Sequence, residues 1–302
     1  MGESVTDRKR ASRHRRTKEP PRMRLTDRDK KVIRAVNDFR VMSQEQVQHL
    51  LFPSKNTAQR RLQLLWQHGF LKREFPLVIG GVQTSTIYYL VDRRGTELLQ
   101  RELGYDKTAL RWSRQKLNQR FLKHTLGLSD IRLAVSLSCR KHDPMEIDFS
   151  IESWQDEKAL KASYDKVQIK NKMVAVLPDA YFVVKVPGGV LRFFLEFDRG
   201  PEHLKFFRQK ISAYWYYFHS PKPQSRYGTT KIRVLTVTEG GATRSGRERL
   251  ASVQKVTKSL GAHTWFWFTS LEEVIQEDFL AAPIWWQTHR EEPSALFTPT
   301  PR

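Results

Sequence analysis

Residues 177–198 read LPDAYFVVKVPGGVLRFFLEFD, a pattern that predicts a β-hairpin. Two runs of β-branched and aromatic residues, 181–186 and 190–195, flank the Pro-Gly-Gly of 187–189. Apolar runs of this kind around a tight, glycine-containing turn are typical of paired antiparallel strands. The acidic residues near the two ends of this segment are therefore expected at the open end of the hairpin.

Asp179, Glu196 and Asp198 are the three carboxylates that would meet there. A two-residue turn places Asp179 level with either Glu196 or Asp198, whereas a three-residue turn pairs it with Phe197 and leaves the cluster looser. Carboxylates gathered at a strand end repel one another unless a cation lies among them, and hard oxygen ligands favour Mg²⁺ or Mn²⁺. The set predicts a divalent metal site; the alternative is a strand end whose charges face water.

The chain is strongly basic. Its 302 residues include 53 Lys and Arg against 32 Asp and Glu, which gives a net charge of +21. A charge of this size predicts a polyanionic partner, and double-stranded DNA is favoured over RNA.

The composition also predicts a cytoplasmic protein with no membrane partner. Cys139 is the single cysteine, so the chain forms neither an internal disulfide nor a multi-cysteine zinc site. No stretch approaches the roughly 20 apolar residues that span a bilayer, and the basic N-terminus lacks the apolar core of a signal peptide.

Residues 25–104 carry the pattern of three short helices and a hairpin. Thr26 and Ser43 are predicted helix caps, and Ser43 forms a capping box with Gln46. Further elements are expected at 56–68 (helix), 70–75 and 84–91 (strands around Gly80-Gly81) and 92–101 (helix). This order predicts a winged helix-turn-helix, whose third helix enters the major groove of DNA while the wing lies on the backbone.

The front of the third helix carries the residues expected to contact bases. They are Lys55, Asn56, Gln59, Arg60 and Gln63. Arginine suits guanine, whereas asparagine and glutamine suit adenine. Winged helices also serve as protein–protein modules, but the basic helix and the net charge favour DNA.

The remainder of the chain alternates helices and strands. The expected elements are a helix at 121–139, a strand at 146–152, the hairpin, a helix at 202–218, a strand at 232–237, a helix at 244–260 and a strand at 264–268. The fold class is therefore α/β (α+β overall), with the order α-β-β-β-α-β in its second domain. Tyr214 to Phe218 could stack bases, but their helical spacing favours a core position.

Five parts are expected along the chain. They are a disordered basic arm (1–24), the winged helix (25–104), a basic connector (105–120), the α/β domain (121–288) and a loose C-terminal tail (289–302). Arg13, Arg15 and Arg16 of the arm are expected to follow DNA phosphates or to enter a minor groove; the alternative is a solubilising tail.

The α-β-β-β-α-β order, with Asp179 opening the second strand and Glu196 in the third, resembles the PD-(D/E)XK nuclease core over residues 121–237. The whole chain resembles the replication-relaxation family of plasmid and mobile-element proteins. The segments that carry this resemblance are Tyr88-Tyr89-Leu90-Val91-Asp92-Arg93-Arg94-Gly95, Leu122-Lys123-His124 with Asp130, Leu177-Pro178-Asp179-Ala180, Phe194-Leu195-Glu196-Phe197-Asp198-Arg199-Gly200, and Lys210 with Tyr214. The resemblance implies a role in plasmid replication and DNA relaxation, with other replication or mobilisation proteins as partners.

One departure from the nuclease pattern leaves two hypotheses open. The lysine that normally stands two residues after the glutamate is replaced by Asp198. In the first hypothesis, Lys210, or less favourably Lys205, reaches back from the next helix while Asp198 joins the metal ligands. In the second, the fold survives as a scaffold without catalysis.

A working site would combine carboxylates, Mg²⁺ and one lysine. Asp179, Glu196 and Asp198 would hold the metal, and Lys210 would stabilise charge in the transition state. Asp130 is a further candidate ligand, its alternative being a solvated helix residue; for Lys210 the alternative is an ordinary exposed lysine. The function is then a metal-dependent DNA endonuclease or nickase, or a non-catalytic replication or transcription factor whose second domain docks partners or dimerises.

Overall fold

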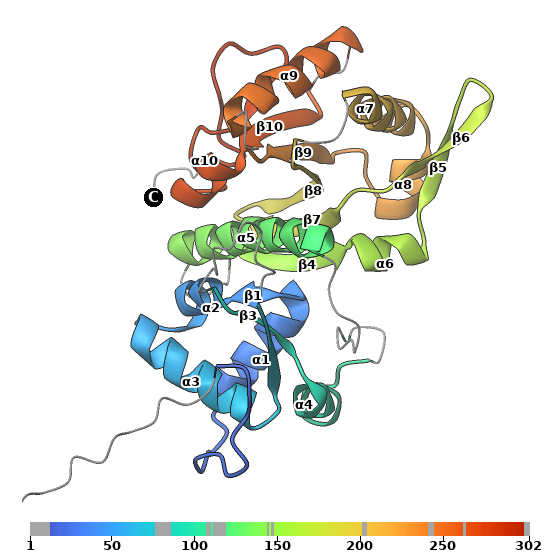
Figure 1. Cartoon of the computed structure of the whole chain (residues 1–302). Coiled ribbons are helices and arrows are strands. Elements are labelled where there is room, and N and C mark those ends of the chain that lie inside the picture. The colour runs from blue at the N-terminus through green and yellow to red at the C-terminus, as the bar shows by residue number, and fades with distance from the viewer. Residues whose placement is uncertain are drawn as a thin grey trace, which may run out of the picture. The chain divides into compact units, whose positions relative to one another are not determined.

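The computed structural model describes residues 13–75, 86–106, 110, 119–143, 145, 148–200, 204–240, 245–261 and 264–298 (Figure 1). The chain forms two compact units that divide between Ser129 and Asp130. The division falls inside a long helix, α5 (Gln119–His142), whereas the sequence placed the second domain from 121. The turn predicted at Gly80-Gly81 and most of the predicted connector at 105–120 lie outside the described residues.

The first unit contains three helices, a three-stranded antiparallel sheet and a fourth helix after the last strand. Its elements are α1 (Asp27–Phe39), β1 (Met42–Ser43), α2 (Gln44–Leu51), α3 (Lys55–Gln67), β2 (Leu71–Glu74), β3 (Tyr88–Val91) and α4 (Arg93–Leu103), with the sheet order β1-β3-β2. Thr26 and Ser43 cap α1 and α2 as predicted, and Ser54 caps α3. Ser43 forms its predicted capping box with Gln46, and Thr26 forms a further capping box with Asp29 that was not predicted.

A buried ion pair joins α1 to α3. Asp29, which completes the capping box of α1, is fully buried, and its carboxylate accepts hydrogen bonds from the guanidinium group of Arg61. The helix α4 packs closely against the segment before β2 at Gly95. A Cβ atom on Gly95 would lie 2.3 Å from the carbonyl oxygen of Phe70, so only glycine allows the two segments to approach so closely.

The basic arm differs from its prediction over residues 13–24. Arg16 donates to a carboxylate oxygen of Asp92 at 2.6 Å and to the carbonyl oxygen of Leu71 at 2.9 Å. The backbone N–H of Thr17 donates to Gln67 at 2.9 Å. The expectation of disorder is therefore wrong for 13–24, and Arg16 holds this segment against the unit because a carboxylate lies within its reach. Residues 1–12 of the arm lie outside the described residues.

The second unit is built on a six-stranded mixed sheet. The strands are β4 (Ser150–Asp156), β7 (Ala180–Val186), β8 (Gly189–Asp198), β9 (Arg233–Thr238), β10 (Phe266–Ser270) and β11 (Trp286–Gln287), in the order β11-β10-β9-β8-β7-β4. β4, β7 and β8 run antiparallel, and β8, β9 and β10 run parallel. The helices are α6 (Glu157–Ala162), α7 (Leu204–Phe218), α8 (Lys222–Tyr227), α9 (Gly246–Ser259) and α10 (Leu271–Gln276). The predicted α-β-β-β-α-β order is confirmed by α5, β4, β7, β8, α7 and β9.

Alternate residues of β8 point to opposite faces of this sheet. Phe194 lies on the face covered by α7, where its ring contacts Tyr214, Tyr217 and Phe218. These three aromatic residues are buried, so the core interpretation of the aromatic segment is confirmed for them. Phe193 lies on the other face, against Phe182.

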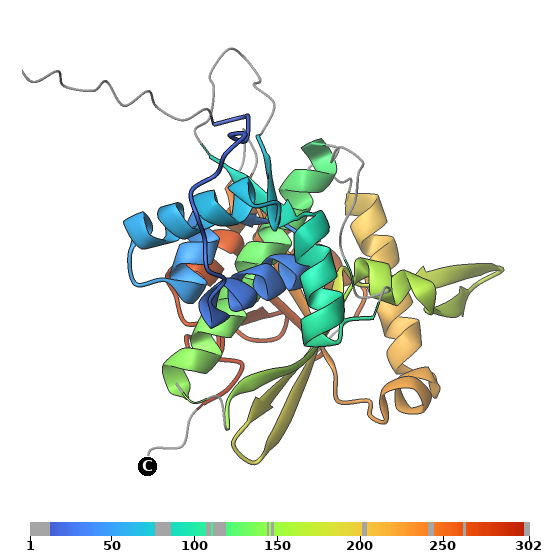
Figure 2. The same ribbon diagram turned by 90° about the horizontal axis from the view of Figure 1, so that it is seen from below.

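A second hairpin was not predicted. β5 (Asp165–Ile169) and β6 (Lys172–Val176) pair antiparallel and project away from the six-stranded sheet (Figure 2). The sequence carries part of the signal, because Val167, Gln168 and Ile169 alternate before Lys170-Asn171, whereas residues 173–176 after it are apolar throughout. Lys170 adopts a φ of 53°, the left-handed conformation that such a two-residue turn requires.

Two predicted boundaries in this unit are wrong. The strand expected at 146–152 begins at Ser150, because Asp143 accepts the backbone N–H groups of Asp148 and Phe149 and turns the chain there first. The C-terminal tail expected to be loose from 289 is exposed at 289–292 but packed over residues 293–297. Leu296 is buried, and the N–H of Phe297 donates to the carbonyl oxygen of Leu280 at 2.9 Å.

Candidate active site

The β7–β8 hairpin has the register that brings Asp179 beside Glu196. Val186 pairs with Gly189, so the turn contains two residues, with Gly188 at a φ of 82°. Ala180 pairs with Leu195, and the N–H of Asp179 donates to the carbonyl oxygen of Leu195 at 2.9 Å. The first of the predicted two-residue turns is therefore correct.

Asp179 is held in place by the opposite strand. Its Oδ2 atom accepts the backbone N–H of Phe197 at 2.8 Å, one residue beyond Glu196. The side chain is half-buried, and the residue stands immediately before Ala180, the first residue of β7. The hairpin itself thus positions this carboxylate.

Glu196 is almost completely buried, with 3% of its surface exposed. Its two carboxylate oxygens accept hydrogen bonds from α7. The ammonium group of Lys210 lies 2.8 Å from Oε2, and the hydroxyl group of Tyr214 donates to Oε1 at 2.5 Å. Because Lys210 and Tyr214 stand four positions apart, both side chains reach the same side of the helix. The helix therefore delivers a cation and a hydroxyl group to one carboxylate.

Burial raises the pKa of Glu196, and the nearby charge of Asp179 raises it further. The ammonium group of Lys210 and the hydrogen bond from Tyr214 oppose this shift, but the net direction of the pKa is upward. Burial, followed by the charge of Glu196, also raises the pKa of Tyr214 well above its ordinary value. Tyr214 consequently stays protonated and acts only as a hydrogen-bond donor to Glu196.

Asp198 does not join Asp179 and Glu196 as predicted. Its carboxylate is buried and accepts hydrogen bonds from the Nη2 atom of Arg249, at 2.8 Å, and from the Nε atom, at 3.2 Å. Its other oxygen accepts the N–H of Gly200 at 2.8 Å. An arginine from α9 therefore pairs with Asp198, and the assignment of Asp198 as a metal ligand and catalytic residue stays a prediction.

The described residues contain no group of three or more His, Cys, Asp or Glu side chains placed to hold a metal ion. Asp130, half-buried on α5, is accordingly not brought into such a group with Asp179 and Glu196. The donor chemistry of the remaining pair still suits Mg²⁺, which proteins commonly bind through one or two carboxylates while water and substrate phosphate complete the shell. Asp179 and Glu196 are the residues that would hold it.

Two partners of this site were missed in the sequence. The sequence places Tyr214 in the core and names it with Lys210 in the family resemblance, but it does not predict the hydrogen bond from its hydroxyl group to Glu196. Arg249 follows no recognisable motif, and its burial next to Leu250 depends on where α9 packs. Lys205, the less favoured candidate lysine, is exposed.

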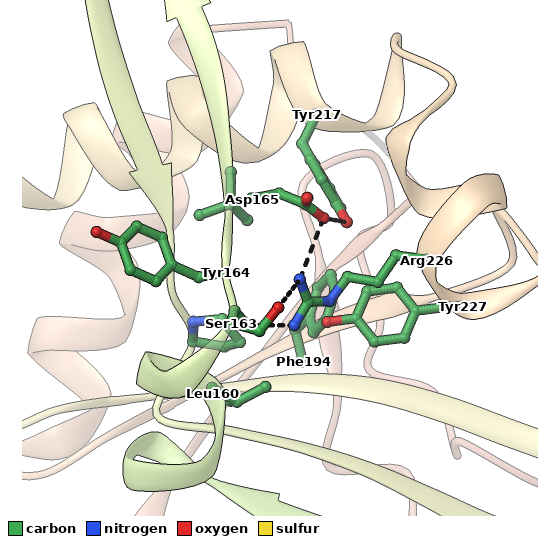
Figure 3. Close-up of a pocket in the computed structure, with 10 residues that line it drawn as sticks. Leu160, Ser163, Tyr164, Asp165, Phe194, Tyr217, Arg226 and Tyr227 are labelled. Atoms are coloured by element: carbon green, nitrogen blue, oxygen red, sulfur yellow. Dashed lines mark hydrogen bonds and ion pairs between the residues drawn. The ribbon is translucent and has the colours of Figure 1, made fainter.

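A small pocket lies close to the start of β7 (Figure 3). It is lined in part by Pro178, Asp165, Tyr217 and Arg226. The hydroxyl group of Tyr217 donates to Asp165 at 2.7 Å, and Arg226 contacts both Asp165 and the carbonyl oxygen of Ser163. These polar groups bind one another, and their contacts hold the base of the β5–β6 hairpin against α7 and α8.

The predicted base-reading residues lie along one stripe of α3. Lys55, Asn56, Gln59 and Arg60 are exposed, and Gln63 is half-buried at the end of the stripe. Gln63 accepts a hydrogen bond from Arg73 of β2 at 2.6 Å.

None of the helices in the described part of the chain is long and apolar enough to cross a membrane.

Comparisons with curated proteins and with solved structures give no close relative of this chain. No curated protein matches the chain. Among solved structures, the restriction endonuclease FokI and the same enzyme bound to DNA are 12% identical, with TM-scores of 0.26 and 0.25. These matches cover 84% of this chain but only 44% and 45% of the FokI chains, so this chain spans less than half their length. A likeness this distant assigns neither fold nor activity.

The family match is of a different kind. The model of the replication-relaxation family covers residues 33–232, from within α1 through the β7–β8 hairpin, α7 and α8 to the residue before β9. The match includes Asp179, Glu196, Lys210 and Tyr214 and extends over most of the chain. The protein therefore belongs to the replication-relaxation family.

Proposed function

We propose that this protein binds duplex DNA through an N-terminal winged helix and nicks or cuts it at a Mg²⁺-dependent site in the second unit. The observation that carries the nuclease part is the contact between Lys210 and Glu196 at the level of Asp179. Two carboxylates and a cation at one strand end are groups that metal-dependent phosphodiester cleavage uses.

The DNA-binding part is supported by the first unit. Three capped helices precede the β2–β3 pair, which is the element order of a winged helix. One face of α3 exposes amide and basic side chains that suit base edges in the major groove. The net charge of +21 favours a polyanion as the partner.

Each residue of the site has a chemical role in this proposal. Asp179 and Glu196 would hold Mg²⁺, which, when bound, polarises the phosphate and lowers the pKa of water. Lys210, with 39% of its side chain exposed, can turn toward a phosphate and stabilise negative charge that develops on its oxygens. Tyr214 keeps the Glu196 carboxylate oriented.

The family membership suggests the setting. A cytoplasmic protein of a plasmid or mobile element would use the first unit to select a site and the second to relax or open the DNA, alongside other replication or mobilisation proteins. Supercoiled DNA is therefore the substrate to test first.

A second candidate function is favoured by a specific observation. Both oxygens of Glu196 already accept hydrogen bonds, and Asp198 is neutralised by Arg249. In this alternative the second unit is a docking or dimerisation scaffold, and the protein is a DNA-binding replication or transcription factor without catalysis.

Incubation of purified protein with supercoiled plasmid and Mg²⁺ or Mn²⁺ separates the two candidates. The nuclease proposal expects nicked or linear product that disappears in Asp179→Asn and Glu196→Gln. Glu277→Gln is the matched control, because Glu277 is an exposed carboxylate on the same unit. Intact plasmid bound tightly by every variant would refute the nuclease and favour the scaffold.

A further inference from the structure

Arg73 lies between two aromatic rings at the junction of β2 and α3. Its guanidinium carbon lies 4.1 Å from the ring centroid of Trp66 and 5.5 Å from that of Tyr89. Its Nη2 atom donates to Oε1 of Gln63 at 2.6 Å and to the hydroxyl group of Tyr89 at 3.2 Å. Cation–π contacts with two rings and two hydrogen bonds fix the direction in which this guanidinium group points.

The contact determines how the amide of Gln63 is turned. A guanidinium group carries only hydrogen-bond donors, so the atom that Gln63 presents to Arg73 must be its carbonyl oxygen. The Nε2 amino group therefore points away from Arg73. Among the described residues, it donates no hydrogen bond to the protein, which leaves two N–H donors available to a ligand.

We infer that Arg73 makes Gln63 a donor-only contact, so that the base pair it faces is read as guanine rather than adenine. The inference rests on the proposed entry of α3 into the major groove. Gln63 continues the stripe of Asn56, Gln59 and Arg60, since these positions recur at helical spacing. It goes beyond the general preference of glutamine for adenine, on which the prediction from sequence was based.

The physical reason lies in the edges of the bases. Adenine presents an acceptor and a donor in the major groove, so an amide must turn both its nitrogen and its oxygen toward that edge. Guanine presents two acceptors, N7 and O6, which suit an amide that offers N–H groups alone. Because Arg73 keeps the oxygen of Gln63 against β2, the guanine edge is the better match.

Selection of bound sequences from a random duplex library tests this inference. The wild-type protein is expected to select a site with guanine at one position, and Gln63→Ala is expected to lose the preference at that position by about tenfold. Arg73→Met removes the donor but keeps an apolar contact with Trp66, so the amide can rotate and the same position is expected to shift toward adenine.

Two further variants make the result interpretable. Arg101→Met removes an exposed arginine from α4 and is expected to leave the selected site unchanged. Gln63→Glu keeps an acceptor for Arg73 but has no N–H donors, so it is expected to lose guanine even if Arg73→Met does not fold.

The possible outcomes are distinct. The informative position is the one whose preference changes in Gln63→Ala. Adenine selected there by the wild-type protein, or guanine retained at every position in both Gln63 variants, would overturn the inference while leaving DNA recognition intact. Guanine retained in a folded Arg73→Met variant would overturn it equally. If the wild-type protein selects no sequence, recognition by α3 fails, and the inference about Gln63 fails with it.

Discussion

The ammonium group of Lys210 lies 2.8 Å from Oε2 of Glu196, fourteen positions earlier in the chain. The nuclease pattern would place a lysine two residues after this glutamate, where the chain has Asp198. The helix α7 supplies the cation instead, and Arg249 pairs with Asp198. The charges at the strand end are thus arranged differently from the short motif, although a cation still faces the glutamate.

Lys210→Met is expected to lower the rate of plasmid nicking by about a hundredfold, the usual effect of removing one group that stabilises transition-state charge. Lys205→Met is the matched control, because Lys205 is an exposed lysine on the same helix. Gel analysis of supercoiled plasmid over time gives both rates. Equal losses in the two variants would show that general positive charge, rather than the position of Lys210, matters.

The Asp198–Arg249 pair is expected to stabilise the second unit. Breaking a buried pair from one side leaves an uncompensated charge and costs about 3–5 kcal/mol. Arg249→Met should therefore lower the free energy of unfolding by this amount, and Asp198→Asn should lower it too. The double variant should lose less than the sum of the two. Tryptophan fluorescence in urea is suited to this measurement because most tryptophans lie in this unit.

The same variants test whether Asp198 binds metal. If Asp198 were a ligand, Asp198→Asn would raise the Mg²⁺ concentration needed for nicking while the unfolding midpoint changed little. A large loss of stability with an unchanged Mg²⁺ requirement, measured below the unfolding transition, would support the structural role.

Arg60 and Arg61 are neighbours with different expected roles. Arg60 is exposed, so Arg60→Ala should weaken binding to a selected DNA site by about 1–3 kcal/mol without changing thermal stability. Arg61 pairs with the buried Asp29, so Arg61→Ala should lower the melting temperature of the first unit. DNA titration and thermal unfolding of both variants test the pair. A reversed pattern would contradict the proposed face of α3.

Asp278 is expected to make stability sensitive to acid. Burial alone would raise its pKa, but hydrogen bonds from Ser138 and Ala281 and the charge of His142 lower the pKa below the ordinary value. A carboxyl group with a lowered pKa stabilises the folded state above its unfolded pKa of about 3.9, and this contribution is lost as the pH falls through the folded value.

Asp278→Asn should therefore be less stable than the wild type at pH 7, and the difference should narrow as the pH falls below about 3.9. Urea unfolding across this range measures it, with Glu277→Gln as an exposed neighbour for comparison. A stability difference that does not change with pH would show that the hydrogen bonds alone, rather than the charge of Asp278, are responsible.

Features encoded by neighbouring residues were predictable. Apolar runs around a glycine turn predicted the β7–β8 hairpin, and its two-residue turn brought Asp179 level with Glu196. Ser43 with Gln46 predicted the start of α2 in the same way. Helix caps, turns and strand alternation are local, so a short window of sequence determines them. The β5–β6 hairpin carries a weaker local signal, because its turn has no glycine and only its first strand alternates.

The tertiary structure alone decided the partners of the charged groups. Asp198 is paired with an arginine fifty-one positions away, and Gln63 is oriented by Arg73 from a different element. Which carboxylate is neutralised and which faces Lys210 depends on how α7 and α9 pack on the sheet. Sequence determined the strand end and its acidic residues by itself, because backbone preference is local. The tertiary structure determined which cation pairs with each carboxylate, because burial and long-range packing set the neighbours of each side chain.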